Sequence, residues 1–272
     1  MLEAKFIKPR ILAVANQKGG VGKTTTAINL GTALAAVGEH VLVIDLDPQG
    51  NASTGLGVPR RSHQKSTYHV LIGEAALDHV IVESAIPRVH CAVSTMDLLG
   101  AELELAALDR KTHRLFDAIN VLVAKANPSR SYSYILIDCP PSLNLLTINS
   151  LTAADAILVP LQCEFFALEG LSQLIKTVER VKNTLNPRLT IQGVVLTMFD
   201  RRNSLSEQVA QDVRSVLGDK VYQTVIPRNV RISEAPSHGK PVLIYDHACV
   251  GSQAYIKLAS EVIRRERELR AA

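Results

Sequence analysis

Residues 11–25 have the sequence ILAVANQKGGVGKTT, in which a short apolar run leads into a glycine-rich loop and then into a helical pattern. The glycines let backbone N–H groups turn inward around phosphate oxygens, and the amino terminus of the following helix adds a partial positive charge. Lys23 can then reach the β- and γ-phosphates, and the hydroxyl of Thr24 can bind Mg²⁺. This stretch therefore predicts a nucleotide phosphate site between a strand and a helix.

The loop departs from the usual phosphate-loop pattern, G-x-x-x-x-G-K-[ST], at one position. That pattern would place its first glycine at position 17, where the chain has Gln17. The next residue, Lys18, is a second lysine that the ordinary loop does not contain. We therefore expect a deviant form of the phosphate loop.

Short β-branched runs alternate with longer amphipathic stretches along most of the chain. Strands are expected at Ile11–Ala15, Val41–Ile44, Val89–Val93, Tyr134–Ile137, Ala156–Val159, Gln192–Thr197, Tyr222–Ile226 and Pro241–Tyr245. Helices are expected at Lys23–Val37, Leu168–Leu185, Ser204–Leu217 and Ser252–Leu269. This alternation predicts an α/β fold with a single doubly wound, mostly parallel, twisted sheet and helices on both faces. One domain is expected over residues 1–272, with an N-terminal tail at 1–9 and a charged C-terminal end at 264–272.

The composition excludes several other classes of protein. The chain has 272 residues, of which 47% are hydrophobic and 21% charged, so it can bury a large core and is not intrinsically disordered. Its longest uncharged stretch, residues 139–154, contains two prolines and several polar residues and does not predict a membrane helix. The four cysteines form no C-x-x-C pair. We expect a cytoplasmic protein.

Carboxylates follow two of the predicted strands. Asp45 and Asp47 come at the end of the second, and Asp138 directly follows the fourth. Ligands of such sheets bind at the carboxyl ends of the strands, where all three side chains would lie. Mg²⁺ prefers oxygen ligands and keeps several waters, so Asp138 is expected to hold one of those waters. Asp47 is placed to orient an attacking water, and Asp45 to support the Mg²⁺ site or the backbone around it.

The loop resembles the deviant phosphate loop of the ParA/MinD class of ATPases. Further stretches are similar to the chromosomal ParA family, also called Soj: residues 45–55, 138–142, 160–171 and 226–237. Together with the loop they extend from Ile11 to about Lys257, with weaker agreement across residues 59–130. Five ordered motifs make the resemblance specific.

The resemblance implies ATP and Mg²⁺ as cofactors and assigns roles to particular residues. In the family, the first lysine of the loop, here Lys18, crosses a dimer interface to the nucleotide of the other subunit. Asn229 is expected to bind adenine, Met198 and Pro227 to pack around it, and Glu164 to contact the ribose across the dimer. The implied catalytic residues are Lys18, Lys23 and Asp47, and the implied metal-site residues are Thr24, Asp45 and Asp138. The implied nucleotide contacts in the loop are Lys18, Gly19, Gly20, Val21, Gly22, Lys23, Thr24 and Thr25.

Basic residues are concentrated in one part of the chain. The net charge is +4, and the window 201–240 holds seven basic residues against four acidic ones, which is +3 of that total. Such a surface attracts polyanions, although charge alone is also typical of a solvated face. By resemblance, Arg202 matches a DNA-contacting arginine. The DNA-binding candidates are Arg201, Arg202, Lys220, Arg228 and Arg231.

The family therefore implies an ATP-dependent partitioning ATPase with weak basal activity. Its ATP-bound sandwich dimer would bind double-stranded DNA without sequence preference, on the nucleoid. A ParB-type centromere-binding partner would stimulate hydrolysis and release it. One alternative is a MinD-like membrane-associated ATPase, which residues 47–51 and the lack of Phe or Trp in the basic C-terminal segment disfavour. Another is an enzyme of the same fold that acts on a small molecule or carries an iron–sulfur cluster, for which Cys139 and Cys163 would be the candidate ligands.

Overall fold

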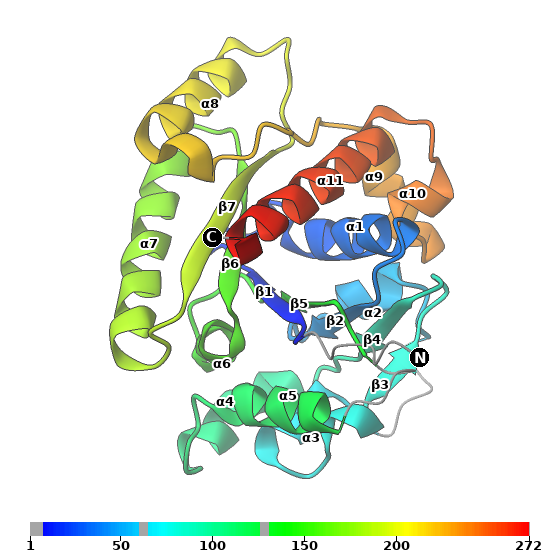
Figure 1. The fold of residues 1–272 in the computed structure, drawn as a ribbon, viewed down its shortest axis with the longest axis vertical. Helices are drawn as coiled ribbons and strands as arrows, with labels where there is room; N and C mark the ends of the chain where they lie inside the picture. The colour runs from blue at the N-terminus through cyan, green and yellow to red at the C-terminus, as the bar shows by residue number, and fades with distance from the viewer. Residues whose placement is uncertain (1–7, 60–64, 126–130, 272) are drawn as a thin grey trace.

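The computed structural model describes residues 8–59, 65–125 and 131–271. Of the expected N-terminal tail, residues 1–7 lie outside this part of the chain. Within it, the strands form a sheet of seven members in the order β3-β4-β2-β5-β1-β6-β7 (Figure 1). The strands are β1 (Arg10–Val14), β2 (Val41–Asp45), β3 (Ile81–Glu83), β4 (Val89–Ala92), β5 (Tyr134–Asp138), β6 (Ala156–Gln162) and β7 (Thr190–Thr197). All pairings are parallel except that of β3 with β4, which confirms the predicted mostly parallel α/β sheet.

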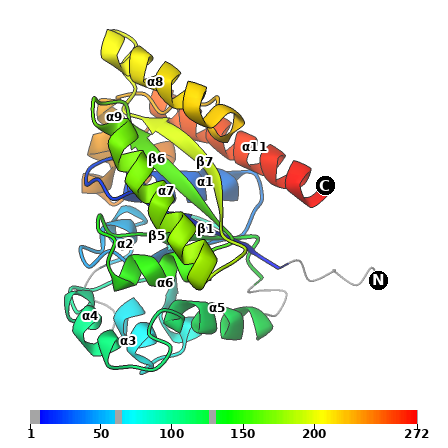
Figure 2. The same cartoon turned by 90° about the vertical axis from the view of Figure 1, so that its left-hand side faces the viewer.

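Helices cover both faces of the sheet (Figures 1 and 2). One face is covered by α1 (Lys23–Ala36), α2 (Asn51–Gly55), α10 (Val242–Tyr245) and α11 (Val250–Ala271). The other face is covered by α3 (Thr67–Ile72), α4 (Leu98–Ala106), α5 (Arg114–Ala124), α6 (Leu145–Ala153), α7 (Ala167–Thr184) and α8 (Ser204–Leu217). The short α9 (Val230–Glu234) precedes α10. The doubly wound arrangement is confirmed, whereas the single-domain organisation stays a prediction.

The central strands are buried on both faces, and their sequences explain why. All five residues of β2 and all five of β5 are buried, and both strands are almost continuously apolar up to their terminal aspartates. Parallel strands covered by helices on both faces have this unbroken pattern, because both sides of the strand face a core. The two hydrophobic cores pack on opposite faces of the sheet. Asp45 and Asp138 are the last residues of β2 and β5 and therefore lie at the carboxyl edge of the sheet.

The final helix packs its apolar face against the sheet. Ala254, Leu258 and Val262 of α11 are buried beside α1. Its charged end, from Arg264 onward, continues as helix to Ala271. Among the helices of the described residues, none is long and apolar enough to cross a membrane.

Two strand predictions were wrong. Residues 222–226 form no strand, because the backbone N–H groups of Gln223 and Thr224 donate to the Glu261 carboxylate of α11, both at 3.0 Å, and not to a strand partner. Residues 241–245 are instead the proline-initiated single turn α10. The edge strand β3 was not predicted, because it is three residues long and only partly buried. Asp138 therefore ends the fifth strand and not the fourth.

Candidate nucleotide site

The glycine-rich loop joins β1 to α1 at the carboxyl edge of the sheet. Gly20 and Gly22 have φ angles of 74° and 89°, in the left-handed region that strains residues with a Cβ atom. Helix α1 begins at Lys23 directly after Gly22, and its first turn, residues 23–26, contains no acidic residue. The N–H groups of that turn and the positive end of the helix dipole are therefore available to an anion. This geometry is that of a phosphate site.

Three hydrogen bonds order the loop, two of them to neighbouring strands and one within the loop. Asn16 donates from Nδ2 to the carbonyl oxygen of Pro160 in β6 at 2.7 Å, and its Oδ1 accepts from the N–H of Lys18 at 3.1 Å. The Thr197 hydroxyl at the end of β7 donates to the carbonyl oxygen of Val21 at 2.8 Å. The loop is thus fixed from two strands, which orders its N–H groups before any ligand arrives.

Lys23 lies inside the loop. Its side chain is buried, and Nζ donates to the carbonyl oxygen of Lys18 at 2.9 Å. Burial lowers the pKa of Lys23, and the nearby carboxylate of Asp138 partly offsets that effect. An anion in the loop would supply the counter-charge that this buried ammonium group needs.

Asp138 is the buried carboxyl group of the site whose oxygens lack hydrogen-bond partners among the described residues. It is the Cα partner of Asp45 across the β2–β5 pair and of Val14 across the β1–β5 pair. The residue is fully buried, and within the described part of the chain neither of its carboxylate oxygens has a hydrogen-bond partner. Burial and the Asp45 carboxylate raise its pKa well above the usual value, while the Thr24 hydroxyl and Lys23 act in the opposite direction.

These residues fit a magnesium ion that takes most of its ligands from water and phosphate. The two orphaned oxygens of Asp138 are acceptors for coordinated water, and Thr24 lies beside them at the start of α1. No group of three or more His, Cys, Asp or Glu side chains could hold a metal ion within the described residues.

Asp45 and Asp47 hold the segment after β2 together. Asp45 Oδ2 accepts from the backbone N–H and the hydroxyl of Ser53, both at 2.8 Å, and Oδ1 accepts from the N–H of Asp47 at 3.2 Å. Burial raises the pKa of Asp45 to about 6, against the opposing hydrogen bonds from Ser53. Asp47 Oδ1 accepts from the N–H of Gln49 at 2.9 Å. Asp45 thus supports the backbone that carries Asp47, and its role at a metal stays a prediction.

A cavity of about 230 Å³ opens beside the loop. It brings together all three residues expected around adenine, Met198, Pro227 and Asn229, with Gly22 and Thr25 of the loop. Met198 has a φ of 50°, an uncommon conformation for a residue with a side chain. The Oδ1 atom of Asn229 is buried and has no hydrogen-bond partner in the described part of the chain. A ligand that donates a hydrogen bond there would satisfy it.

Lys18 and Glu164 meet within one chain. Lys18 Nζ forms an ion pair with Glu164, whose other oxygen accepts from the side-chain amide of Gln162. Both charged side chains are about half exposed at the loop surface. This ion pair lies within one chain, and the expected roles of both residues across a dimer stay predictions.

Comparisons with known proteins agree with this geometry. A family model described as an AAA domain matches residues 9–191. The chain is 64% identical over 262 residues to the chromosome partitioning protein ParA of Caulobacter vibrioides (strain NA1000 / CB15N), covering 96% of this chain and 97% of the relative. It is 49% identical over 253 residues to the sporulation initiation inhibitor protein Soj of Bacillus subtilis (strain 168), covering 93% and 98%.

The chain belongs to the ParA/Soj family of chromosome-partitioning ATPases. It is also similar to a solved structure, cobyrinic acid a,c-diamide synthase from Mycobacterium smegmatis with bound ADP and magnesium. That similarity has a TM-score of 0.81 and 34% identity over 95% of this chain and 96% of the other.

Sequence reasoning missed three residues that support this ParA-family site through contacts with distant parts of the chain or with its carboxylates. Ser53 binds Asp45, Asn16 anchors the loop, and Tyr255 of α11 lines the adenine-side cavity with its hydroxyl 3.4 Å from that of Thr26. Asn16 had a usable signal, because it is a buried polar residue between an apolar strand and a glycine loop. Tyr255 had none, since it lies 229 positions from Thr26.

The DNA-binding candidates lie in three separate places. Arg201 and Arg202 are exposed between β7 and α8, and Arg228 is beside them because its N–H donates to the carbonyl oxygen of Phe199 at 3.0 Å. Lys220 lies in the short 3₁₀ helix Gly218–Lys220, next to the residue that bridges to Val194 of β7. Arg231 pairs with Glu234 at 3.0 Å on α9. The structure thus groups Arg201, Arg202 and Arg228, while Lys220 lies on another segment and Arg231 lies on α9, three residues after Arg228.

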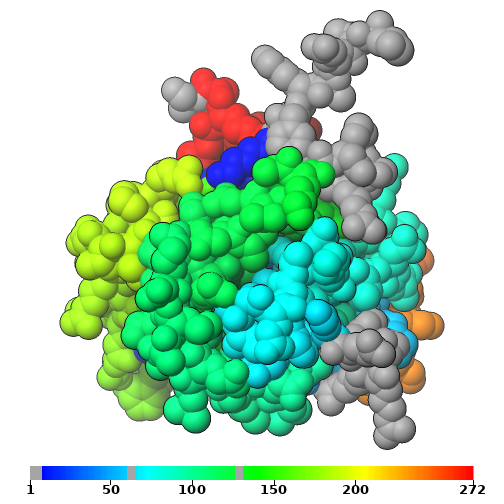
Figure 3. Space-filling model, turned by 90° about the horizontal axis from the view of Figure 1, so that it is seen from below, coloured from blue at the N-terminus to red at the C-terminus, as the bar shows by residue number. Residues whose placement is uncertain are grey.

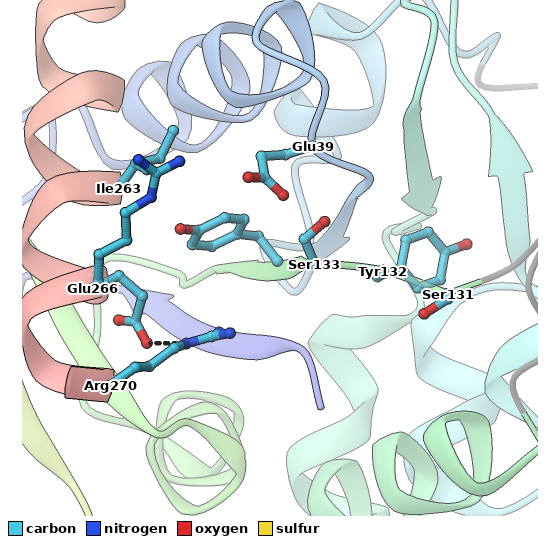
Figure 4. A pocket seen from close by; sticks show the side chains of 9 residues that line it. Glu39, Ser131, Tyr132, Ser133, Ile263, Glu266 and Arg270 are labelled. Carbon is cyan, nitrogen blue, oxygen red and sulfur yellow. Dashed lines mark hydrogen bonds and ion pairs between the residues drawn. The ribbon is translucent and has the colours of Figure 1, made fainter. Parts of the chain in front are cut away.

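A second, larger cavity lies at the opposite edge of the sheet. It measures about 340 Å³ and lies between the end of α11 and the segments before β2 and β5 (Figure 4). Glu266 in its wall forms ion pairs with Arg10 at 3.0 Å and with Arg270 at 3.3 Å. This edge holds the amino ends of the parallel strands, away from the phosphate loop. Its buried charges are paired, and none of the predicted site residues lines it.

Cys139 and Cys163 do not fit the iron–sulfur alternative. Both are buried in the same apolar core, and burial raises their pKa to about 12 and about 11. A cluster shared between subunits needs thiolates at the surface, whereas these cysteines are neutral and enclosed.

Proposed function

We propose that this protein is an ATP-dependent DNA-partitioning switch. The observation that carries the proposal is the joining of the phosphate loop, the unpartnered Asp138 carboxylate and the cavity with Met198, Pro227 and Asn229 at one edge of the sheet. This combination has a place for the phosphates, for a hydrated Mg²⁺ and for a base. The family to which the chain belongs supports partitioning as the purpose of that site.

In the proposed reaction, the chain contributes positioning and charge. The loop N–H groups and Lys23 hold the β- and γ-phosphates, and Thr24 with Asp138 holds Mg²⁺ and its waters. When bound, Mg²⁺ would neutralise phosphate charge. Asp47 orients the attacking water, since its carboxylate is fixed by the Gln49 N–H within the segment that Asp45 supports. Phosphoryl transfer gains mainly from such positioning and neutralisation.

ATP is proposed to assemble a sandwich dimer. Lys18 would leave Glu164 of its own chain and reach the nucleotide of the other subunit. Glu164, released in the same step, is proposed to contact the ribose across the dimer. A monomer would then lack one of its catalytic cations, and weak basal hydrolysis follows.

The dimer is proposed to bind double-stranded DNA through backbone phosphates, with Arg201, Arg202 and Arg228 on each subunit and with Lys220 and Arg231 as outlying contacts. Each phosphate that the protein neutralises adds about −0.9 to the slope of log affinity against log salt concentration. Because a dimer doubles the number of phosphate contacts, DNA affinity at physiological salt would depend strongly on dimerisation. Phosphate contacts carry no sequence information, and nucleoid binding would be non-specific. A ParB-type centromere-binding protein would stimulate hydrolysis and release the dimer.

The test is duplex DNA binding measured with ATP, with ADP and without nucleotide, each for the parent and for Asp47→Ala. We expect tight binding only with ATP, and longer-lived binding in Asp47→Ala because only its chemical step loses support. Sedimentation in the same buffers reports the dimer. Equal DNA binding in all three nucleotide states would refute the switch.

The MinD-like membrane alternative is disfavoured by the packing of α11. An amphipathic anchor needs a free apolar face, whereas Ala254, Leu258 and Val262 are buried against the core. Flotation with anionic liposomes and ATP distinguishes the two, and we expect the protein to remain in the unbound fraction.

A further inference from the structure

The outer side of α4 carries an apolar stripe. Met96, Leu99 and Leu103 are 54%, 62% and 83% exposed, and no described residue covers them. At 100° per residue, Leu99 and Leu103 point away from the core side of the helix, and Met96 lies one turn before them. The core side is formed by Leu98, Ala101 and Leu105. We call Met96, Leu99 and Leu103 the α4 stripe; Figure 3 views the underside of the molecule, where α3, α4 and α5 lie.

Acidic side chains flank the α4 stripe on both sides. On the helical projection Glu102 lies on one side of it, and Asp97 and Glu104 lie on the other. One oxygen of Glu102 is buried and has no hydrogen-bond partner in the described chain, and Glu104 accepts one bond from the Tyr68 hydroxyl at 2.8 Å. Acidic side chains thus flank the stripe along the helix, on a chain whose net charge is +4, while one basic side chain, Lys111, lies at the end of α4, where its Nζ donates to the carbonyl oxygen of Ala106 at 3.3 Å.

The segment that joins β4 to α4 is bonded, through Ser94, to the segment that carries Asp47. Ser94, between β4 and α4, donates from its hydroxyl to the carbonyl oxygen of Asp47 at 2.6 Å, and its N–H donates to the Ser53 hydroxyl at 3.3 Å. A Cβ atom added at Gly50 would lie 3.3 Å from the carbonyl oxygen of Ser94, so the two segments are in close contact. A shift at the start of α4 would therefore move the backbone of Asp47.

We propose that the α4 stripe is the docking surface for a basic amphipathic helix of the protein that stimulates hydrolysis, and that docking reaches Asp47 through Ser94. The inference rests on the proposed function, which includes such a protein. Leu99 and Leu103 lie about one turn apart on α4, and Met96 lies two residues before the helix begins, so the stripe offers apolar contacts along one side of a docked helix. Basic residues flanking an apolar face would complement Asp97, Glu102 and Glu104.

A second copy of this chain is the less suitable occupant. Two α4 stripes facing each other would bring the same acidic side chains together, and like charges across an interface oppose association. A basic partner helix meets no such repulsion.

The test uses the purified ParB-type partner protein and the double variant Leu99→Ser/Leu103→Ser. We expect the Kd for the partner to rise about tenfold or more, because exposed leucines at the centre of a contact are anchors, with basal hydrolysis unchanged. Leu269→Ser is the matched control, since Leu269 is 58% exposed on α11, remote from the stripe. Glu104→Lys should weaken binding mainly at low salt.

Two further variants test the route through Ser94. We expect Ser94→Ala to bind the partner with the parent's Kd but to lose most of the stimulated kcat, and Ser94→Thr, which keeps the hydroxyl, to recover it. An unchanged stimulated kcat in Ser94→Ala would overturn this route.

The outcomes separate the inference from the function on which it rests. If the partner does not stimulate the parent, the proposed function fails. If it stimulates the parent and the leucine double variant equally, the docking surface is wrong and the function stands. A double variant that instead loses ATP-driven dimerisation would show that the α4 stripe is a self-interface, which also overturns the inference.

Discussion

The two edges of the sheet differ in whether their buried charged side chains have partners. At the amino edge, Glu266 is buried but pairs with both Arg10 and Arg270. At the carboxyl edge, Asp138 is buried with neither oxygen paired in the described chain, and Lys23 donates to a backbone carbonyl without a paired carboxylate. A buried charge that is paired has its desolvation cost offset by its partner, whereas one left unpaired carries that cost until a ligand completes it. The unpaired edge is therefore the site, although the paired edge has the larger cavity.

The largest expected effect is at the unpaired edge. Lys23→Ala should weaken ATP binding about a thousandfold, because it removes the charge that faces the phosphates while the loop stays in place. Titration with a fluorescent ATP analogue measures the loss, with Lys176→Ala on the exposed side of α7 as the control. Retained binding would mean that the loop N–H groups alone suffice.

At the paired edge, the loss should be in stability and not in activity. Glu266→Ala leaves the partly buried Arg10 without its carboxylate, and we expect urea unfolding to show a loss of about 3 kcal/mol with ATP hydrolysis unchanged below the transition. Glu268→Ala on the same helix breaks only the exposed pair with Arg264 and should cost less than about 1 kcal/mol. A fall in ATP affinity for Glu266→Ala would erase the distinction between the edges.

Asp138→Asn should produce a gain in stability and a loss in function. Because the pKa of Asp138 is raised in the folded state, the folded protein binds more protons than the unfolded chain, so stability without Mg²⁺ falls as the pH rises above the ordinary carboxylate value of 3.8. The variant should lack that fall and be more stable than the parent at pH 7, while Mg²⁺-dependent hydrolysis is lost. Thermal unfolding across pH 4 to 8, with exposed Asp219→Asn as the control, decides the matter.

The smallest expected effect is on DNA binding, and it concerns Arg202, which forms an ion pair with Asp200 at the carboxyl edge of the sheet. Arg202 is 88% exposed and binds Asp200 through Nε and Nη2 at 3.0 and 2.9 Å, and these bonds lower the pKa of Asp200 to about 2. We expect Arg202→Ala to weaken DNA binding equally for all sequences and to reduce the salt slope by about 1, with dimerisation intact. Arg180→Ala, on α7, is the control. If the slope does not change, Arg202 serves only Asp200.

The parts of this molecule that could be predicted are those fixed by neighbouring residues. The loop at 18–25 and helix α1 follow from local glycine and helix chemistry, and β2 and β5 from unbroken apolar runs. Residues 222–226 were mispredicted because the acceptor of their backbone N–H groups, Glu261, is 37 and 38 positions away. The contact of Ser94 with Asp47 joins residues 47 apart. Side-chain to backbone bonds at such separations leave no periodic trace in a sequence.

The ion pair between Lys18 and Glu164 has a consequence for how reversible the proposed assembly is. An exposed pair of this kind contributes about 0 to 1 kcal/mol, so exchanging it for a contact across subunits changes the free energy of association little in either direction. The balance between monomer and dimer would then be set by the γ-phosphate, and its loss on hydrolysis would part the subunits of the proposed dimer. Within each chain, Glu164 provides an ion-pair partner for the Lys18 ammonium group. Separated subunits would therefore return to the same starting state after every turnover.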